Sequence, residues 1–168
     1  MKNIILTGMP GAGKSTTGVI LAKALRKKFI DTDIVIQETT GRLLQDIIDE
    51  DGPDAFKMIE EEIILAHRFR NTVIATGGSV VFSDRAMQHL RQDGMVIYLA
   101  ISFKEMEHRL KNITTRGIVL TRGESLREMY DERLPLYRKY ADITVDCSGT
   151  DFEVVVGSVQ NEIRAFPG

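Results

Sequence analysis

A glycine-rich segment near the amino terminus, Gly8–Ser15, constrains this chain more than any other feature. It matches the phosphate-binding pattern G-x-x-x-x-G-K-S and lies between the apolar run Ile4–Thr7 and a segment of helical spacing from Lys14 to Lys27. In such a loop the glycines let backbone N–H groups converge on phosphate oxygens, and the following helix adds partial positive charge at its amino terminus. The sequence therefore predicts a nucleotide triphosphate site directly after a buried first strand.

The residues of this loop have separate expected tasks. We expect Lys14 to reach the β- and γ-phosphates and Ser15 to hold Mg²⁺ through its hydroxyl. An ordinary Gly-rich turn is the alternative, but the flanking strand and helix favour the nucleotide site. The expected nucleotide-binding residues of the loop are Gly11, Ala12, Gly13, Lys14, Ser15 and Thr16.

Short apolar runs alternate with segments of helical spacing along the chain, which is the pattern of βαβ units. Such runs predict strands that are buried on both faces of a parallel sheet. We therefore predict an α/β fold, a three-layer α/β/α sandwich around a five-stranded parallel sheet. The expected strands are Ile4–Thr7, Phe29–Ile30, Thr72–Ala75, Met95–Leu99 and Ile143–Val145.

Helices are expected between these strands. A serine hydroxyl can cap the helix that follows Ser83, and Pro135 should kink or interrupt a later helix. The stretch from Lys111 to Gly123 lacks a sustained period, so we predict a mobile loop there. The other expected helices run from about Lys14 to Lys27, from Pro53 to Arg68, from Arg122 to Tyr140 and from Asp151 to Phe166.

Composition excludes several classes of protein. The 168 residues fit one domain, so we expect residues 1–168 to form a single compact unit. A formal charge of −2 offers no cationic field for nucleic acid, and no apolar run approaches the roughly 20 residues that span a bilayer. Cys147 is the only cysteine, and the amino-terminal apolar run is too short for a signal peptide. We expect a soluble, cytoplasmic monomer that binds neither nucleic acid nor membrane.

Two carboxylates, Asp31 and Asp33, follow the second predicted strand at the edge where open parallel sheets bind ligands. We expect Asp31 to assist the metal through water. Asp33 could accept a hydrogen bond from a substrate hydroxyl and assist its deprotonation. The alternative is a helix cap, since an Asp before Ile34–Ile36 is a normal amino-terminal signal.

The motifs, in their order and spacing, resemble those of the shikimate kinase family, a branch of the P-loop kinases. The resemblance covers nearly the whole chain. It implies the P-loop kinase fold, bound ATP and Mg²⁺, and transfer of a phosphoryl group to shikimate to form shikimate 3-phosphate. Besides the phosphate loop, it rests on Asp31–Asp33, Thr40–Arg42, Asp51–Gly52, Phe56–Glu60, Gly77–Gly78 and Arg133–Tyr137.

The resemblance also implies roles for individual residues. Asp33 corresponds to the aspartate that faces the acceptor hydroxyl, and Arg116 to an arginine on a lid over residues near 111–123. Arg109 corresponds to a position that borders the adenine. The catalytic residues are then Lys14, Asp33 and Arg116, and Ser15 and Asp31 hold the metal. The implied substrate-binding residues are Asp33, Lys57, Gly77, Gly78 and Arg133.

Three departures from the family pattern fall near the expected substrate. Lys57 stands where the family has a carboxylate-gripping arginine, and a lysine cannot form two parallel bonds to a carboxylate. Glu60, three residues later, could position Lys57. Ser79 replaces the third glycine of a Gly-Gly-Gly turn and would be strained at positive φ. Gly117 replaces the proline that follows the lid arginine.

These departures leave the function open at the level of the sequence. The chain could be a shikimate kinase with altered contacts, or it could phosphorylate a different small hydroxy acid or polyol. A nucleotide-binding sensor that has lost catalysis and a nucleoside monophosphate kinase are further alternatives.

Overall fold

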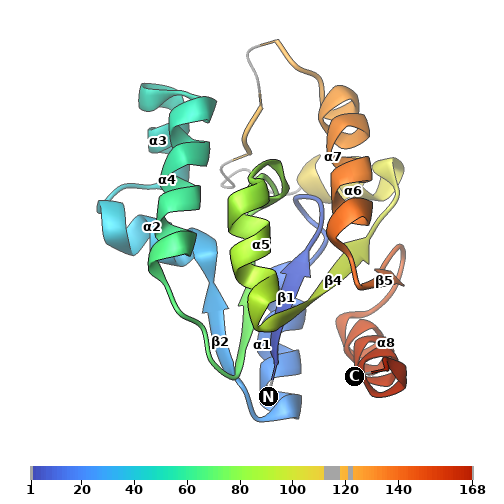
Figure 1. Ribbon diagram of the computed structural model, residues 1–168. Coiled ribbons are helices and arrows are strands. Elements are labelled where there is room, and N and C mark those ends of the chain that lie inside the picture. Colours follow the sequence, from blue (N-terminus) through green and yellow to red (C-terminus); the bar gives the residue numbers. More distant parts are fainter. Residues whose placement is uncertain (1, 112–117, 121–122, 168) are drawn as a thin grey trace.

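The computed structural model describes residues 2–111, 118–120 and 123–167, which form a parallel sheet with helices on both faces (Figure 1). The strands are β1 (Asn3–Thr7), β2 (Lys28–Asp31), β3 (Thr72–Ala75), β4 (Gly94–Ala100) and β5 (Ile143–Asp146). The helices are α1 (Lys14–Leu25), α2 (Thr32–Thr40), α3 (Leu44–Asp51), α4 (Pro53–Ala66), α5 (Asp84–Gln92), α6 (Phe103–Lys111), α7 (Leu126–Tyr140) and α8 (Phe152–Ala165), with a short 3-10 helix η1 (Val80–Phe82).

The five strands have the order β2-β3-β1-β4-β5, and every neighbouring pair is parallel. Helices α1 and α8 pack together, and Figure 1 shows α5 on the opposite face of the sheet from α1. The predicted α/β/α sandwich around a five-stranded parallel sheet is confirmed. Within the described ranges, no helix combines the length and the apolar character needed to cross a membrane.

Burial explains why the strands could be found from the sequence. All five residues of β1 are buried because this strand lies in the middle of the sheet. The edge strand β5 instead alternates: Ile143 and Val145 are buried, whereas Thr144 and Asp146 are exposed. The other edge strand, β2, extends beyond the predicted Phe29–Ile30 to Lys28 and Asp31, because parallel pairing with β3 includes these polar residues.

The predicted helices are present, with two corrections. Helix α7 runs without interruption through Pro135, since packing of its buried face compensates for one lost backbone hydrogen bond. It begins at Leu126 and not at Arg122, because Ser125 and Glu128 form a reciprocal capping box in front of it. Helix α2 was foreseen only as the helix-cap alternative at the Asp31–Asp33 pair, and helices α3 and α6, which have eight and nine residues and carry many charges, were not predicted.

Helices α2, α3 and α4 form a wall beside the sheet and have a small hydrophobic core of their own (Figure 1). Two of the family motifs meet on this wall, where Arg42 forms ion pairs with Asp51 at 2.6 Å and Glu50 at 2.5 Å. These motif residues therefore stabilise the wall and do not line the cavity described below. The core of the wall consists of Ile36, Leu44, Ile47, Ile48, Phe56, Ile63 and Val119.

Gly94 offers a test of the packing between α5 and β4. A Cβ at this position would lie 2.6 Å from the Leu90 carbonyl oxygen and 2.2 Å from the Ile5 Cδ1 atom. We expect Gly94→Ala to lower the free energy of unfolding by about 1–3 kcal/mol, measured by urea denaturation, because the backbone must shift. Gly157→Ala in α8 is the matched control: its Cβ meets nothing within 4 Å. It should raise stability by about 0.5–1 kcal/mol, and equal effects of the two changes would contradict this account.

Candidate active site

A cavity of about 250 Å³ opens at the edge of the sheet where β1, β2 and β3 end. The phosphate loop contributes Lys14 to it, the segment after β2 contributes Asp31 and Asp33, and the turn after β3 contributes Gly77–Ser79. Arg133 reaches it from α7, and the wall of α2–α4 supplies apolar side chains. The cavity therefore gathers the motifs that lie far apart in the sequence.

The phosphate loop has a shape that requires glycine at two positions. Gly11 and Gly13 have φ values of +81° and +86°, and a Cβ on Gly13 would lie 2.5 Å from the Phe152 ring. The Lys14 ammonium folds back onto the loop and donates hydrogen bonds to the carbonyl oxygens of Gly8 at 2.8 Å and Met9 at 2.9 Å. Lys14 is thus held at the mouth of the loop, next to the amino terminus of α1.

The two oxygens of Asp31 have different partners. Oδ1 accepts a hydrogen bond from the Asp33 backbone N–H at 2.9 Å and so caps α2. Oδ2 accepts a hydrogen bond from the Ser15 hydroxyl at 2.5 Å. The helix cap is therefore Asp31, and Asp33 lies in the first turn of α2. A hydroxyl and a carboxylate oxygen side by side are the hard oxygen ligands that Mg²⁺ prefers, so Ser15 and Asp31 fit the predicted metal site.

Asp33 lies next to a second carboxyl group, Glu60 of α4. A Cβ on Gly77 would be 2.9 Å from Asp33 Oδ1 and 2.6 Å from Glu60 Oε2, so both carboxyl groups approach the same glycine. Glu60 is 2% exposed, and its Oε1 accepts a hydrogen bond from the Ser79 hydroxyl at 2.8 Å. Burial, and then the charge of Asp33, raise the pKa of Glu60 to about 7. Ser79 has φ −88°, so the serine is not strained.

Arg133 is 2% exposed and donates a hydrogen bond from Nη2 to the Val119 carbonyl oxygen at 2.5 Å. Its Nε atom has no hydrogen-bond partner within residues 2–111, 118–120 and 123–167. Tyr137, one turn later on α7, donates its hydroxyl to the Gly78 carbonyl oxygen at 2.5 Å. Helix α7 thus supplies a buried cation to the cavity and also anchors the turn after β3.

Lys57, which the family resemblance implies as a substrate-binding residue, lies beside the Phe82 ring. Its Nζ atom lies 4.3 Å from the centroid of the Phe82 ring, and the described residues that line the cavity do not include Lys57. The Arg133 guanidinium lies 5.6 Å from the same ring. Within the described chain, Glu60 takes its hydrogen bond from Ser79 and not from Lys57. Lys57 is therefore a cation beside the Arg133 end of the cavity.

Arg109 connects the phosphate loop to the segment after β5. It donates hydrogen bonds to the carbonyl oxygens of Gly11 at 2.9 Å and Cys147 at 3.2 Å, and it pairs with Glu105 at 2.9 Å. Its guanidinium is thus held beside the loop by three groups. Arg116 and Gly117 lie outside the described residues.

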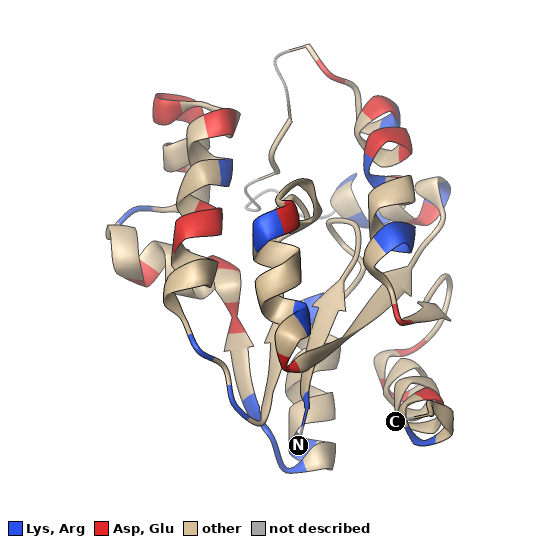
Figure 2. Ribbon diagram, in the orientation of Figure 1, with Lys and Arg blue, Asp and Glu red and all other residues tan. Residues whose placement is uncertain are grey.

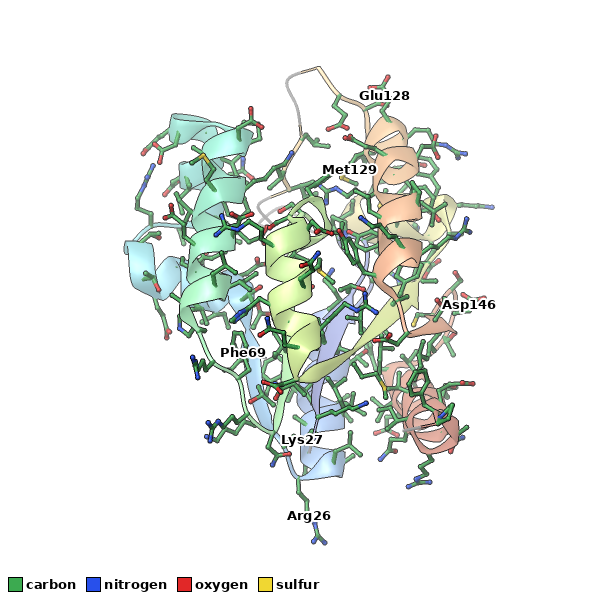
Figure 3. The ribbon with its side chains drawn as sticks, in the orientation of Figure 1. Arg26, Lys27, Phe69, Glu128, Met129 and Asp146 are labelled. Carbon is green, nitrogen blue, oxygen red and sulfur yellow. The ribbon has the colours of Figure 1, made fainter. Side chains whose placement is uncertain are left out.

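Two groups of like-charged residues, one acidic and one basic, lie elsewhere on the molecule. Figure 2 shows acidic residues gathered on α3 and the adjoining end of α4. The basic run Arg26–Lys28 lies at the opposite end of the molecule, where Figure 3 labels Arg26 and Lys27. Lys27 donates hydrogen bonds there to Asn71 and to the Lys2 carbonyl oxygen.

Sequence reasoning missed Phe82, the contact between Ser79 and Glu60, and the place of Tyr137 behind Gly78. The aromatic ring of Phe82 follows the Gly77–Ser79 turn, but no local pattern indicates that it meets two cations. The only available signal was the pair of departures at Lys57 and Ser79, because both changes alter possible donors to Glu60.

The pKa of Glu60 makes a prediction about stability. Its value of about 7 in the folded protein exceeds the ordinary 4.5, so the folded state binds more protons between these values. The contribution of Glu60 to stability is present below pH 4.5 and is lost as the pH rises through 7. We expect the free energy of unfolding to fall between pH 5 and pH 8 more steeply in the parent than in Glu60→Gln. The loss of free energy of unfolding in the parent should exceed that in Glu60→Gln by about 1.4 kcal/mol for each unit by which folding raises the pKa of Glu60. Parallel curves from urea denaturation would contradict it.

Comparisons with known proteins agree with the motifs. A family model described as shikimate kinase matches residues 10–164. A shikimate kinase of Thermodesulfovibrio yellowstonii is 38% identical over 165 residues, which are 96% of this chain and 95% of that protein. One from Thiobacillus denitrificans is 39% identical over 147 residues, which are 86% of this chain and 80% of that protein.

Solved structures extend the agreement to the fold. The structure of shikimate kinase from Acinetobacter baumannii in complex with shikimate has a TM-score of 0.89 and 28% sequence identity, covering 98% of this chain and 94% of that one. A deoxyadenosine kinase from M. mycoides has a TM-score of 0.60 at 16% identity over 98% of this chain and all of that one, which shows the fold alone. The predicted family resemblance is confirmed. The chain belongs to the shikimate kinase family and is an ATP-dependent small-molecule kinase.

Proposed function

We propose that the protein transfers the γ-phosphoryl group of ATP to a hydroxyl of shikimate and forms shikimate 3-phosphate. The observation that carries this proposal is the cavity in which Lys14, Asp33 and Arg133 face a common space. Lys14 suits the phosphates of ATP, and Asp33 suits the acceptor hydroxyl of shikimate. The buried Arg133 guanidinium suits the carboxylate of shikimate. The similarity to a shikimate kinase whose structure contains shikimate supports the same assignment.

The reaction makes few covalent demands on the protein. The acceptor oxygen forms a bond to the γ-phosphorus while the bond from that phosphorus to the bridging oxygen breaks, and ADP leaves. Asp33 aligns the hydroxyl and accepts its proton, and Lys14 neutralises charge on the transferring group. A bound Mg²⁺, held by Ser15 and Asp31, would supply further neutralisation of the phosphate oxygens. Catalysis therefore rests mainly on positioning and on electrostatics.

The remaining site residues have supporting roles in this proposal. Arg133 grips the substrate carboxylate, and Gly77 and Gly78 let the substrate approach the turn after β3. Lys57 adds positive charge at the Arg133 end. Arg116 closes over the transferring phosphoryl as a lid residue, and Arg109 borders the adenine, where its bonds to the loop would hold it. The loop residues Gly11, Ala12, Gly13, Ser15 and Thr16 contact the phosphates.

The proposal includes the setting of the enzyme. Residues 1–168 act as one kinase domain, because the cavity draws on the sheet, α7 and the wall of α2–α4. The enzyme works as a monomer in the cytoplasm and uses Mg²⁺. The buried, unpaired Cys147 fits a reducing compartment. Sedimentation analysis tests the monomer, and loss of turnover in EDTA tests the metal requirement.

The first test is ATP-to-ADP conversion by purified protein with Mg²⁺, with and without shikimate. We expect strong stimulation by shikimate in the parent and at least a hundredfold lower kcat in Asp33→Asn, because the amide cannot accept the proton. ATP binding by the variant, measured calorimetrically, should persist. A panel of other hydroxy acids, polyols and nucleoside monophosphates serves as control. Stimulation by a panel compound and not by shikimate would identify that compound as the acceptor. No stimulation by shikimate or by any panel compound would indicate a nucleotide-binding sensor.

Arg133 and Lys57 should differ in their effect on shikimate binding. Arg133→Lys removes the possibility of two parallel bonds to the carboxylate, so we expect KM for shikimate to rise about tenfold. Lys57→Met should raise it less than threefold, because Lys57 lies over Phe82 and not among the described lining residues. The KM for ATP is the control and should stay unchanged in both variants. Equal effects on the shikimate KM would show that Lys57 shares the carboxylate.

A further inference from the structure

Two departures from the family pattern, Lys57 and Ser79, differ in how they relate to the buried Glu60 carboxyl group. Ser79 donates a hydrogen bond to it, whereas Lys57, on the same helix as Glu60, lies over the Phe82 ring. Glu60 is 2% exposed and lies against Gly77, directly below the turn that lines the cavity. A buried carboxyl group needs hydrogen-bond donors, because leaving its oxygens unpaired costs desolvation free energy that nothing returns. The residue that donates a hydrogen bond to Glu60 therefore determines the orientation of the Glu60 carboxyl group.

Among the described residues, the side-chain donor to Glu60 is Ser79. Its hydroxyl lies 2.8 Å from Oε1, whereas Oε2 has no hydrogen-bond partner within the described chain. The family pattern has glycine at this position, and glycine has no side-chain donor. Ser79 adopts φ −88° and ψ −6°, so a non-glycine residue is accommodated without backbone strain.

Lys57 lies one turn before Glu60 on α4 but has a different neighbour. Its ammonium stands 4.3 Å from the centroid of the Phe82 ring, in a cation–π arrangement. The same ring lies 5.6 Å from the Arg133 guanidinium. Lys57 therefore lies beside η1, and the side-chain donor to Glu60 within the described chain is Ser79.

The position of Glu60 matters for the acceptor site because Asp33 is close to it. Glu60 Oε2 and Asp33 Oδ1 lie 2.6 and 2.9 Å from the point where a Gly77 Cβ would stand. A rotation of the Glu60 carboxyl would change both the space and the charge that Asp33 meets. Lys14 and Arg133 also act on Glu60 through their charges.

We infer that Ser79 is a positioning residue: its hydroxyl takes the place of a cationic donor to Glu60 and thereby fixes the Asp33 carboxylate opposite the acceptor hydroxyl. The statement about the acceptor rests on the proposed function. The statement about the Ser79–Glu60 contact does not, and the two can be tested separately.

Steady-state kinetics with shikimate tests the role in the acceptor site. Ser79→Ala should lower kcat about tenfold and leave KM for ATP unchanged, because the phosphate loop is not altered. Ser79→Thr keeps the hydroxyl and should remain within about threefold of the parent. Ser158→Ala, which removes a hydroxyl bonded within α8, is the matched control and should behave as the parent. Equal losses in Ser79→Ala and Ser79→Thr would overturn the inference.

A double variant tests whether the two departures exchange the donor. Ser79→Gly should lose activity as Ser79→Ala does. Lys57→Arg in the Ser79→Gly background should recover most of it, because a guanidinium offers five N–H donors at the correct position on α4. Lys57→Arg alone should give no gain. A double variant that is no more active than Ser79→Gly would overturn the exchange of donors.

Carbon-13 NMR of the glutamate carboxyl groups tests the contact without any acceptor. The Glu60 signal is identified by its absence from Glu60→Gln. It should move in Ser79→Ala and stay in place in Ser79→Thr and Ser158→Ala. An unmoved signal in Ser79→Ala would overturn the contact. If the parent shows no turnover with shikimate while the Glu60 signal moves in Ser79→Ala, the proposed function is contradicted and the Ser79–Glu60 contact is supported.

Discussion

The turn that leaves β1 is the constraint on which the rest of the site depends. β1 lies between β3 and β4, and a Cβ at Gly8, where the chain leaves this strand, would stand 2.7 Å from the Leu99 carbonyl oxygen. A Cβ at Gly13 would overlap the Phe152 ring. The chain can therefore pass from strand to helix only with glycine at these points, and this passage presents the loop N–H groups and the α1 amino terminus to a phosphate.

The parallel register carries the other groups to the same edge. Residues of β3 pair with both β1 and β2, so that the segments after these strands emerge together. Asp31 meets Ser15 across this edge, and the Gly77–Ser79 turn faces Asp33. The phosphate site and the acceptor site are thus two parts of one sheet edge, which suits a reaction that needs donor and acceptor in line.

Buried charges in this site are held by neighbours from several layers. Arg133 comes from α7, Glu60 from α4 and Lys14 from α1, and each meets the strand ends from a different direction. Tyr137 anchors the turn through Gly78, so that α7 holds both a cation and the backbone near it. Ser79, where the family pattern has glycine, adds a hydroxyl donor to Glu60 outside the phosphate loop.

The sequence by itself indicated the five strands and their alternation with helices along the chain, the phosphate loop and the pair Asp31–Asp33. These features depend on local periodicity and on glycine and cap chemistry. The order of the strands in the sheet came only from the structure. The sequence offered α2 only as the helix-cap alternative at the Asp31–Asp33 pair, and it indicated neither the short helices α3 and α6 nor the continuity of α7 through Pro135. In these elements the packing of buried faces outweighs local preference. Only the tertiary structure decided the partners of Lys57, Ser79 and Glu60. These partners come from α4, η1 and the turn after β3, and only the folded sheet brings those segments into contact.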